Sequence, residues 1–191
     1  MTTEPTRCSW CGDDPLYQAY HDEEWGRPQH DDRHLFEMLI LEGAQAGLSW
    51  ITILKRREGY RRVFHHFDPV RVAAMTDSEL EQALQDPGII RNRLKVASTR
   101  DNARAFLAMQ AQHGSFSRWL WDHVAGQPVL RPAGLRQHLA TSPLSDQISR
   151  ELKKAGMRFV GSTIIYAYLQ ATGVVNDHAP GCYLYPGTAN T

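Results

Sequence analysis

The 191-residue sequence predicts an all-α fold, and three observations support that prediction. Residues that cap or end helices recur along most of the chain. Alternating apolar and polar patterns, which are typical of strands, are scarce and short. No internal repeat or low-complexity tract is found. Because domains usually hold about 100–200 residues, we expect residues 1–191 to form a single domain, either as one compact body or as two helical lobes with a pocket between them.

Two helices are expected near the N-terminus. Either Asp31 or Asp32 can cap a helix that extends to about Gln45, and Gly47 can end it. A second helix is expected over 49–56, where the serine at the first position can act as the cap.

The middle of the chain predicts three more helices. Residues 76–79 form a capping-box pattern, and the Asp-Pro-Gly sequence at 86–88 ends the helix that follows. The segment 89–112 is rich in helix formers, and a shorter helix is expected over 115–124. Residues 125–143 are richer in glycine and proline and are expected to be an irregular connection.

The last two helices are expected over 145–154 and 162–172, with a tight turn between them. The amides at the start of the second helix would point outward, where an anion could bind. This is the shape of a helix-hairpin-helix element that grips DNA phosphates, although an ordinary helical corner would leave the same pattern. The residues expected to contact DNA here are Lys153, Lys154, Gly161, Ser162 and Thr163.

The charges of the chain balance overall but are unevenly distributed. There are 21 basic and 21 acidic residues, giving a formal net charge of zero. Residues 1–42 hold ten acids and three bases, and residues 43–191 hold 18 bases and 11 acids. A basic body favours a polyanionic partner, although an inert dipolar surface would give the same count.

No segment of the sequence indicates a membrane or a secretory pathway. The longest apolar runs, such as 48–54, are far shorter than the ~18–20 residues of a membrane span. Residues 1–7 are polar and lack the apolar stretch of a signal peptide. We therefore expect a soluble cytoplasmic protein without a membrane partner.

The cysteines indicate a metal rather than disulfides. The chain has three of them, Cys8, Cys11 and Cys182, and an odd number without a secretion signal argues against a disulfide framework. His21 and His178 lie close to them in the sequence, so five candidates exist for the four positions of a structural zinc ion. The Cys-x-x-Cys spacing alone favours Cys8 and Cys11, and a site built from both chain ends favours a closed structural role.

Aromatic residues and one glutamate form a second candidate site. Tyr17 and Tyr20 are spaced to share a helix face, and Trp25 follows soon after. Glu42 lies late in an apolar helix, shortly before Trp50. Aromatic faces with one carboxylate suit a pocket that stacks a planar base and hydrogen bonds to its amino edge. Alternatively, the aromatic residues belong to the core and the glutamate faces solvent.

From about residue 7 to residue 187, the chain resembles the bacterial 3-methyladenine DNA glycosylase I family. The resemblance runs in order through nearly the whole chain, and its motifs are long. The matching strings are Asp14–Tyr17, Tyr20–His21, Trp25–Gly26, Leu35–Met38, Leu41–Gly43, Gln45–Ile51, Phe67–Val70, Gly88–Arg91, Phe159–Gly161 and Val175–His178.

The resemblance implies an all-α helix-hairpin-helix DNA glycosylase in which one structural zinc ion joins the N- and C-terminal segments. It assigns the metal to Cys8, His21, His178 and Cys182. In this set His21 takes the place of Cys11, which the spacing alone favours. It places Glu42, Tyr20 and Trp50 around a flipped base, with Tyr17, Trp10 and Trp25 nearby. The aspartate that is catalytic in related glycosylases is not expected to act in its usual way, and the role of the nearby Asp177 stays open.

The activity implied is hydrolysis of the N-glycosidic bond of N3-methyladenine in double-stranded alkylated DNA. The methylated base is cationic and already a good leaving group, so the protein mainly extrudes it, binds it and admits water. No lysine stands out as a Schiff-base nucleophile, which predicts base release without strand cleavage. We expect a monomer without an organic cofactor, in which residues around Gln45, Gly47 and Leu48 fill the gap left in the duplex.

Two other classes of function compete with this hypothesis. A zinc-stabilised DNA-binding module would bind DNA in a salt-sensitive way and release no base. A zinc hydrolase would lose its chemistry, but not its fold, when the metal is removed.

Overall fold

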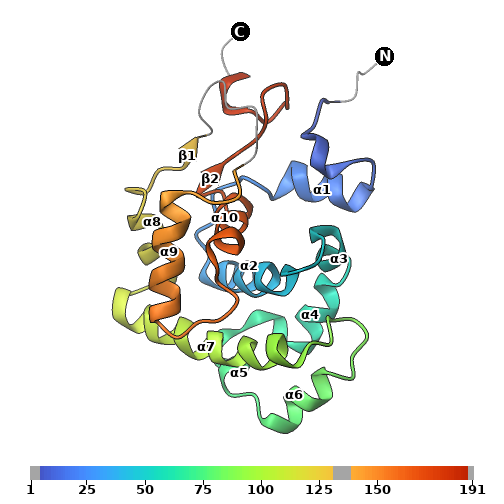
Figure 1. Ribbon diagram of the computed structural model, residues 1–191, viewed down its shortest axis with the longest axis vertical. Coiled ribbons are helices and arrows are strands. Elements are labelled where there is room, and N and C mark those ends of the chain that lie inside the picture. The colour runs from blue at the N-terminus through green and yellow to red at the C-terminus, as the bar shows by residue number, and fades with distance from the viewer. Residues whose placement is uncertain (1–4, 131–138, 189–191) are drawn as a thin grey trace.

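The computed structural model describes residues 5–130 and 139–188, and it is built mainly of α-helices (Figure 1). Short 3-10 helices cover Ser9–Cys11, His65–Phe67 and Pro186–Thr188. The α-helices are α1 (Pro15–Glu23), α2 (Asp32–Gln45), α3 (Trp50–Leu54), α4 (Arg57–Val63), α5 (Pro69–Ala73), α6 (Asp77–Ala83), α7 (Arg93–His113), α8 (Phe116–Asp122), α9 (Pro143–Lys154) and α10 (Ser162–Ala171).

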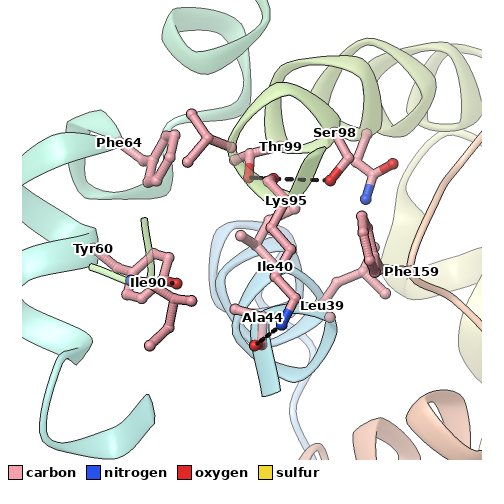
Figure 2. Close-up of a pocket in the computed structure, with 13 residues that line it drawn as sticks. Leu39, Ile40, Ala44, Tyr60, Phe64, Ile90, Lys95, Ser98, Thr99 and Phe159 are labelled. Carbon is pink, nitrogen blue, oxygen red and sulfur yellow. Dashed lines mark hydrogen bonds between the residues drawn. The ribbon is translucent and has the colours of Figure 1, made fainter. Parts of the chain in front are cut away.

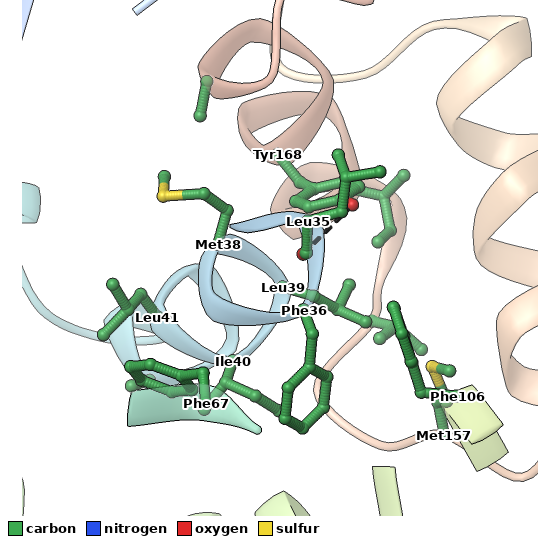
Figure 3. Packing of buried hydrophobic residues seen from close by; sticks show 14 of the residues in the cluster. Leu35, Phe36, Met38, Leu39, Ile40, Leu41, Phe67, Phe106, Met157 and Tyr168 are labelled. Atoms are coloured by element: carbon green, nitrogen blue, oxygen red, sulfur yellow. Dashed lines mark hydrogen bonds between the residues drawn. The ribbon is translucent and has the colours of Figure 1, made fainter. Parts of the chain in front are cut away.

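Helix α2 lies at the centre of the molecule, and it contacts α3, α7, α8 and α10 (Figure 1). Its apolar side chains are buried around its whole circumference, as Figure 3 shows, because other helices cover every face. The hydroxyl of Tyr168 on α10 donates a hydrogen bond to the Leu35 carbonyl at 3.2 Å. The α2 residues drawn in the core are Leu35, Phe36, Met38, Leu39, Ile40 and Leu41.

Two neighbouring aspartates at the start of α2 serve different helices. Asp31 caps α2 by accepting a hydrogen bond from the His34 amide at 2.8 Å. Asp32 instead accepts from the amides of Phe116 and Ser117, at 2.9 and 2.7 Å. The second aspartate therefore joins the start of α8 to α2, which the local sequence alone does not reveal.

Several predicted helices are confirmed, with shifted boundaries. The capping box at 76–79 begins α6, and Ser115 caps α8. The helix predicted over 49–56 ends at Leu54, and a separate helix α4 follows it. The helix predicted from residue 89 begins at Arg93, because the Asn92 side chain caps it.

The C-terminal part of the chain also follows the prediction closely. Helix α9 begins at Pro143, two residues before the predicted start, because Ser142 supplies the cap and proline is favoured in the first turn. Within the irregular connection predicted for 125–143, residues 131–138 lie outside the described part of the chain. The strand β1 (Val129–Leu130) pairs in parallel with β2 (Val175–Asn176).

The close approach of α4 to the turn before α7 yields a stability prediction. A Cβ atom on Gly59 would lie 2.2 Å from the Gly88 carbonyl oxygen, so Gly59→Ala must displace backbone. We expect it to lower the free energy of unfolding by about 1–3 kcal/mol or more, measured by thermal melting. Gly161→Ala is the matched control, since its Cβ meets nothing within 4 Å. Equal melting temperatures for the two variants would contradict the packing described here.

The segments nearest the two chain ends lie together at one end of the molecule (Figure 1). The Tyr183 amide donates to the Thr6 carbonyl at 2.9 Å, which joins the two segments directly. Among the described helices, none is both long enough and apolar enough to cross a membrane.

Candidate active site and metal cluster

A cavity of about 240 Å³ lies between α1, α2, α3 and α10. It contains all six side chains that the sequence analysis placed in a base pocket, and Gln45 from the expected DNA contacts. Leu139, Ala167 and Gln170 complete the lining and were not predicted. The predicted pocket residues in the lining are Trp10, Tyr17, Tyr20, Trp25, Glu42 and Trp50.

The walls of this cavity are aromatic. The ring of Trp10 lies 5.0 Å from Tyr17 and 4.9 Å from Trp25, measured between ring centroids. In the same lining, the ring of Tyr20 lies 5.4 Å from the ring of Trp50, also measured between centroids. The two rings of each pair stabilise each other through edge-on or tilted contacts. The walls of the cavity are therefore held in place before any ligand binds. The cavity therefore suits a flat, aromatic guest.

Three buried polar atoms of the cavity residues have no hydrogen-bond partner among the described residues. They are the indole nitrogens of Trp10 and Trp50 and the Oε2 atom of Glu42. Buried polar groups in native proteins are nearly always paired, so a cluster of exceptions needs an explanation. Two donors and one acceptor around one aromatic cavity indicate a planar ligand that itself carries both acceptors and donors.

The charge state of Glu42 responds to its surroundings. The residue is 3% exposed, and burial raises the pKa of its carboxyl group to about 8. A carboxylate in this cavity is costly unless a cation or hydrogen-bond donors stabilise it. A guest with a positive charge would lower that cost and would therefore be favoured over its neutral analogue.

A second cluster brings together Cys8, His21, His178 and Cys182, whose possible ligand atoms all lie within 4.8 Å of one another. The Cys182 sulfur lies 3.4 Å from Nε2 of His21 and 3.6 Å from Nδ1 of His178. The Cys8 sulfur is also 3.6 Å from Nδ1 of His178. A tetrahedral zinc ion with typical bond lengths separates sulfur and nitrogen ligands by roughly 3.5 Å, so these residues fit such an ion.

The surroundings of the cluster orient its ligands. Nδ1 of His21 lies 2.8 Å from Asp22, and Nε2 of His178 lies 3.2 Å from the Trp25 carbonyl, contacts that fix the ring tautomers of metal ligands. Burial lowers the pKa of His178 to about 4, so its ring is neutral at neutral pH, as a metal ligand must be. Burial also raises the pKa of the Cys8 thiol to about 12, and a bound cation would stabilise its thiolate.

Cys11 lies outside this cluster, so the preference that spacing alone gave to it is wrong. Its thiol donates to the Cys8 carbonyl at 3.1 Å. Cys11 ends the short 3-10 helix that follows Cys8, whereas His21, on α1, belongs to the cluster. The ligand set implied by the family resemblance is the one that the structure brings together.

The Cys/His cluster and the aromatic cavity share side-chain contacts. The His21 ring lies 5.3 Å from Trp10, and the His178 ring lies 4.8 Å from Trp25, measured between ring centroids. Each tryptophan also lines the cavity. A change in the Cys/His cluster can therefore reach the cavity wall through a single contact.

Comparison with known proteins decides the family. A family model described as methyladenine glycosylase matches residues 10–185. The chain belongs to the methyladenine glycosylase family. The glycosylase is 52% identical over 182 residues to DNA-3-methyladenine glycosylase 1 of Escherichia coli (strain K12), an alignment that covers 95% of this chain and 97% of that protein. It is 44% identical over 178 residues to DNA-3-methyladenine glycosylase of Haemophilus influenzae, covering 93% of this chain and 96% of that one.

Solved structures agree with this assignment. A crystal structure of 3-methyladenine DNA glycosylase I superposes on this glycosylase with a TM-score of 0.91 at 52% identity, covering 95% of this chain and 100% of that one. A structure of the Staphylococcus aureus enzyme, solved to explain 3-methyladenine recognition, superposes with a TM-score of 0.87 at 34% identity and covers 93% and 95% of the two chains.

The loop after α2 of this glycosylase lies beside the aromatic cavity. Gly47 adopts a left-handed backbone with φ of +78°, and Leu48 next to it is 42% exposed. A smaller cavity of about 190 Å³ separates this loop from Thr163 and Ile164 at the start of α10. Because Glu42 and Gln45 line both cavities, the loop and the aromatic pocket form one continuous surface.

The turn between α9 and α10 has the predicted local features. Gly156, with φ of +93°, follows the end of α9, and Gly161 precedes α10 as its cap residue. Lys153 and Lys154 are exposed at the end of α9. The Ser162 hydroxyl is already bonded to Asp146 at 2.5 Å, so the backbone amides of this turn remain the groups suited to an anion.

The contribution of α10 to the pocket was not predicted from the sequence. Ala167 and Gln170 are spaced three apart on one face of the helix, and both line the cavity. The Gln170 amide donates to the buried Asp177 carboxylate at 2.7 Å, and the Tyr166 hydroxyl donates to the same oxygen at 3.2 Å. Asp177 therefore reaches the pocket through Gln170, and it is Gln170 that lines the cavity. The spacing of the two α10 residues is the signal that could have identified them.

Proposed function

We propose that this glycosylase excises 3-methyladenine from alkylated double-stranded DNA by hydrolysing the N-glycosidic bond, without cleaving the strand. The observation that carries the proposal is the convergence on one aromatic cavity of buried polar atoms from Trp10, Trp50 and Glu42 that have no hydrogen-bond partner within residues 5–130 and 139–188. The names of the relatives, DNA-3-methyladenine glycosylases from two bacteria, support the same substrate.

The chemistry of the lesion explains why a single carboxylate suffices. Methylation at N3 gives adenine in DNA a positive charge, which weakens the glycosidic bond before the enzyme acts. The protein has to extrude the nucleotide, at a cost of a few kcal/mol, bind the charged base and admit water to the sugar carbon. Unmodified adenine would be left in place because its bond is intrinsically stable.

Each pocket residue has a role in this proposal. Trp50 stacks on the flipped base, and Tyr20, whose ring lies 5.4 Å from that of Trp50, adds a second contact. Glu42 accepts hydrogen bonds from the amino edge and stabilises the positive charge in a site of low dielectric. The remaining aromatic side chains, Tyr17, Trp10 and Trp25, form the walls that exclude water.

The proposed DNA contacts come from two segments of the chain, both of which line the smaller cavity of about 190 Å³. Gln45, Gly47 and Leu48, which we call the wedge loop, would enter the duplex and fill the space that the flipped nucleotide leaves. The turn between α9 and α10 would act as a helix-hairpin-helix element that holds the phosphate backbone. The hairpin residues in that role are Lys153, Lys154, Gly161, Ser162 and Thr163.

We also propose that the Cys/His cluster holds one zinc ion in a structural role. Two thiolates and two imidazoles are a donor set that zinc favours, and all four positions are filled by protein. When bound, the ion would supply cross-linking of the chain ends rather than an activated water. The Arg7 guanidinium lowers the pKa of Asp22 to about 2, so Asp22 is ionised at neutral pH and can hydrogen bond to the His21 ring.

We propose that the protein acts as a monomer without an organic cofactor. The cationic leaving group removes the need for an organic cofactor. One copy of the chain holds the whole candidate pocket, which supports action as a monomer. Action on chromosomal DNA implies a cytoplasmic location in a bacterium, and the division into two lobes stays a prediction.

The direct test is incubation of the purified protein with methylated duplex DNA. We expect chromatography to identify free 3-methyladenine, and gels to show intact strands until the abasic sites are cleaved by alkali. Binding to DNA without any released base would favour the DNA-binding module and contradict the proposal. Strand cleavage that accompanies base release would contradict the monofunctional mechanism.

Truncating the wedge gives a separate prediction. Leu48→Ala removes the exposed apolar side chain of the wedge loop, so we expect affinity for an abasic-site duplex to fall by about tenfold. Val70→Ala is the control, since Val70 on α5 is 62% exposed and distant in sequence from the loop. Fluorescence anisotropy measures both. Unchanged affinity for Leu48→Ala would contradict the role of the loop.

A further inference from the structure

One face of α7 contacts both of the proposed DNA-binding elements. Lys95 and Asn102 are seven residues apart, so they lie two turns apart on the same side of the helix. The Lys95 ammonium donates to the carbonyl oxygens of Ala44 at 2.9 Å and Ala46 at 2.7 Å. Figure 2 shows the Lys95 side chain reaching from α7 to the end of α2. The wedge loop therefore begins at a stretch of backbone whose carbonyl groups are hydrogen bonded to Lys95.

The contact suits the end of a helix. The last carbonyl groups of α2 have no partner within the helix, and they carry the negative end of its dipole. An ammonium group with three donors satisfies two of these carbonyls at once. Because Ala44 and Ala46 lie on either side of Gln45, this contact fixes the point where the chain leaves the helix.

Asn102 makes a similar contact with the hairpin. Its side-chain amide donates to the Arg158 carbonyl at 2.9 Å, and its side-chain oxygen accepts from the Arg158 amide at 2.8 Å. Asn102 is buried, and the next residue in the hairpin, Phe159, has a left-handed backbone with φ of +55°. A paired contact of this kind sets both the position and the orientation of the hairpin backbone.

The space between these contacts is closely packed. A Cβ atom on Gly43 would lie 3.2 Å from the Cβ atom of Phe159, so the hairpin rests directly against the last turns of α2. The cavity enclosed there is only about 10 Å³. Figure 2 shows Lys95, Phe159 and Ala44 around that space. Little room remains there for the last turn of α2, from which the wedge loop leaves, to shift relative to Phe159.

We propose that α7 acts as a fixed spacer between the wedge loop and the hairpin, with Lys95 and Asn102 as positioning residues for DNA binding. The inference rests on the proposed function, since it needs both elements to contact the same duplex. The wedge loop must fit the duplex at the lesion while the hairpin contacts the phosphates of the same duplex. A shift of about 1 Å in either element would weaken the joint fit.

The test measures the affinity of four variants for an abasic-site duplex and for free 3-methyladenine, together with their melting temperatures. We expect Lys95→Met and Asn102→Leu each to weaken duplex binding by about tenfold. Affinity for the free base, followed by tryptophan fluorescence, should stay within about twofold, because neither residue lines the aromatic cavity. Lys95→Arg, which keeps the donors and the charge, should restore most of the duplex affinity. The double variant Lys95→Met with Asn102→Leu should bind the duplex only slightly more weakly than the single variant that binds it less well. The two effects should not add, because both contacts fix the same distance between the wedge loop and the hairpin.

Two controls separate positioning from simple attraction of phosphates. Arg71→Met removes one positive charge from the exposed surface of α5 and should change duplex affinity by less than about twofold. The salt dependence of binding by Lys95→Met should keep the wild-type slope, since a lost phosphate contact would reduce that slope by about one.

The outcomes distinguish this inference from the proposed function. Unchanged duplex affinity in folded Lys95→Met and Asn102→Leu would overturn the spacer role, and so would equal losses for the duplex and the free base. If Asn102→Leu does not fold, the comparison of Lys95→Met with Lys95→Arg decides. A wild-type protein that neither binds the abasic duplex nor releases base would overturn the proposed function, and the spacer role with it.

Discussion

Replacing Glu42 with glutamine is expected to reduce the rate of 3-methyladenine release by about 10²–10³-fold. The side chain keeps its size and can still accept a hydrogen bond, but it no longer stabilises a positive charge in the buried cavity. Single-turnover release from methylated duplex DNA measures the effect. Glu23→Gln, which makes the same change at an exposed position on α1, is the control and should release base at the wild-type rate. A rate for Glu42→Gln within about twofold of the wild-type rate would contradict the role of Glu42 and would mean that other residues recognise the base.

The same substitution should make the protein more stable at alkaline pH. Burial raises the pKa of Glu42 from 4.5 to about 8, so the folded state holds a proton that the unfolded state releases. The free energy of unfolding of the wild type therefore falls as the pH rises from about 4.5 to about 8. Above about pH 8 this contribution of Glu42 no longer changes. Glutamine does not titrate, so the advantage of Glu42→Gln should be absent near pH 4 and reach a few kcal/mol near pH 9. Thermal melts at about those two pH values measure it, and an equal difference at both would contradict the burial of the carboxyl group.

Removing the proposed zinc ion should cause the largest loss of stability. The cluster joins segments at the two ends of the chain, so a bound ion closes a loop that spans nearly the whole protein. We expect chelation, or His178→Ala, to lower the melting temperature by roughly 10 °C, with metal content measured by atomic spectroscopy. Cys11→Ser is the matched control and should keep both the metal and the wild-type melting temperature, because Cys11 lies outside the cluster.

The melting result also separates the structural role from a catalytic one. Loss of base release after chelation, with an unchanged melting temperature, would favour a zinc hydrolase and contradict our assignment. Since Trp10 and Trp25 pack against the ligand rings, we also expect metal-free protein to bind free 3-methyladenine more weakly.

Local sequence signals predicted much of the fold because caps act over a few residues. The capping box that begins with Thr76 and the cap at Ser115 are examples. The break between α3 and α4 was not predicted, because no glycine or proline marks it. Contacts from distant parts of the chain hold α4 there: Arg57 bonds to Glu37 at 2.5 Å and to Glu24 at 2.7 Å. Such ion pairs depend on the folded arrangement and leave no pattern in the local sequence.

The candidate site was predictable where residues lie in motifs and unpredictable where the fold brings them together. The grouping of Glu42 and the aromatic residues around one cavity was anticipated because they fall in short strings near the N-terminus. Gln170 was missed because its place in the pocket depends on how α10 packs against α2. Lys95 was missed for a related reason, since a lysine in a helix usually faces solvent and only the structure shows its two carbonyl partners.

The central claim, that a buried carboxylate in an aromatic cavity recognises the cationic base, is tested most directly by the pH dependence of kcat/KM for base release. This quantity reports ionisations of the free enzyme. For the wild type, kcat/KM should rise with pH and level off above about 8, as the Glu42 carboxylate forms. For Glu42→Gln, it should be far lower and show no ionisation in that range. Superimposable profiles for the two proteins would contradict the claim.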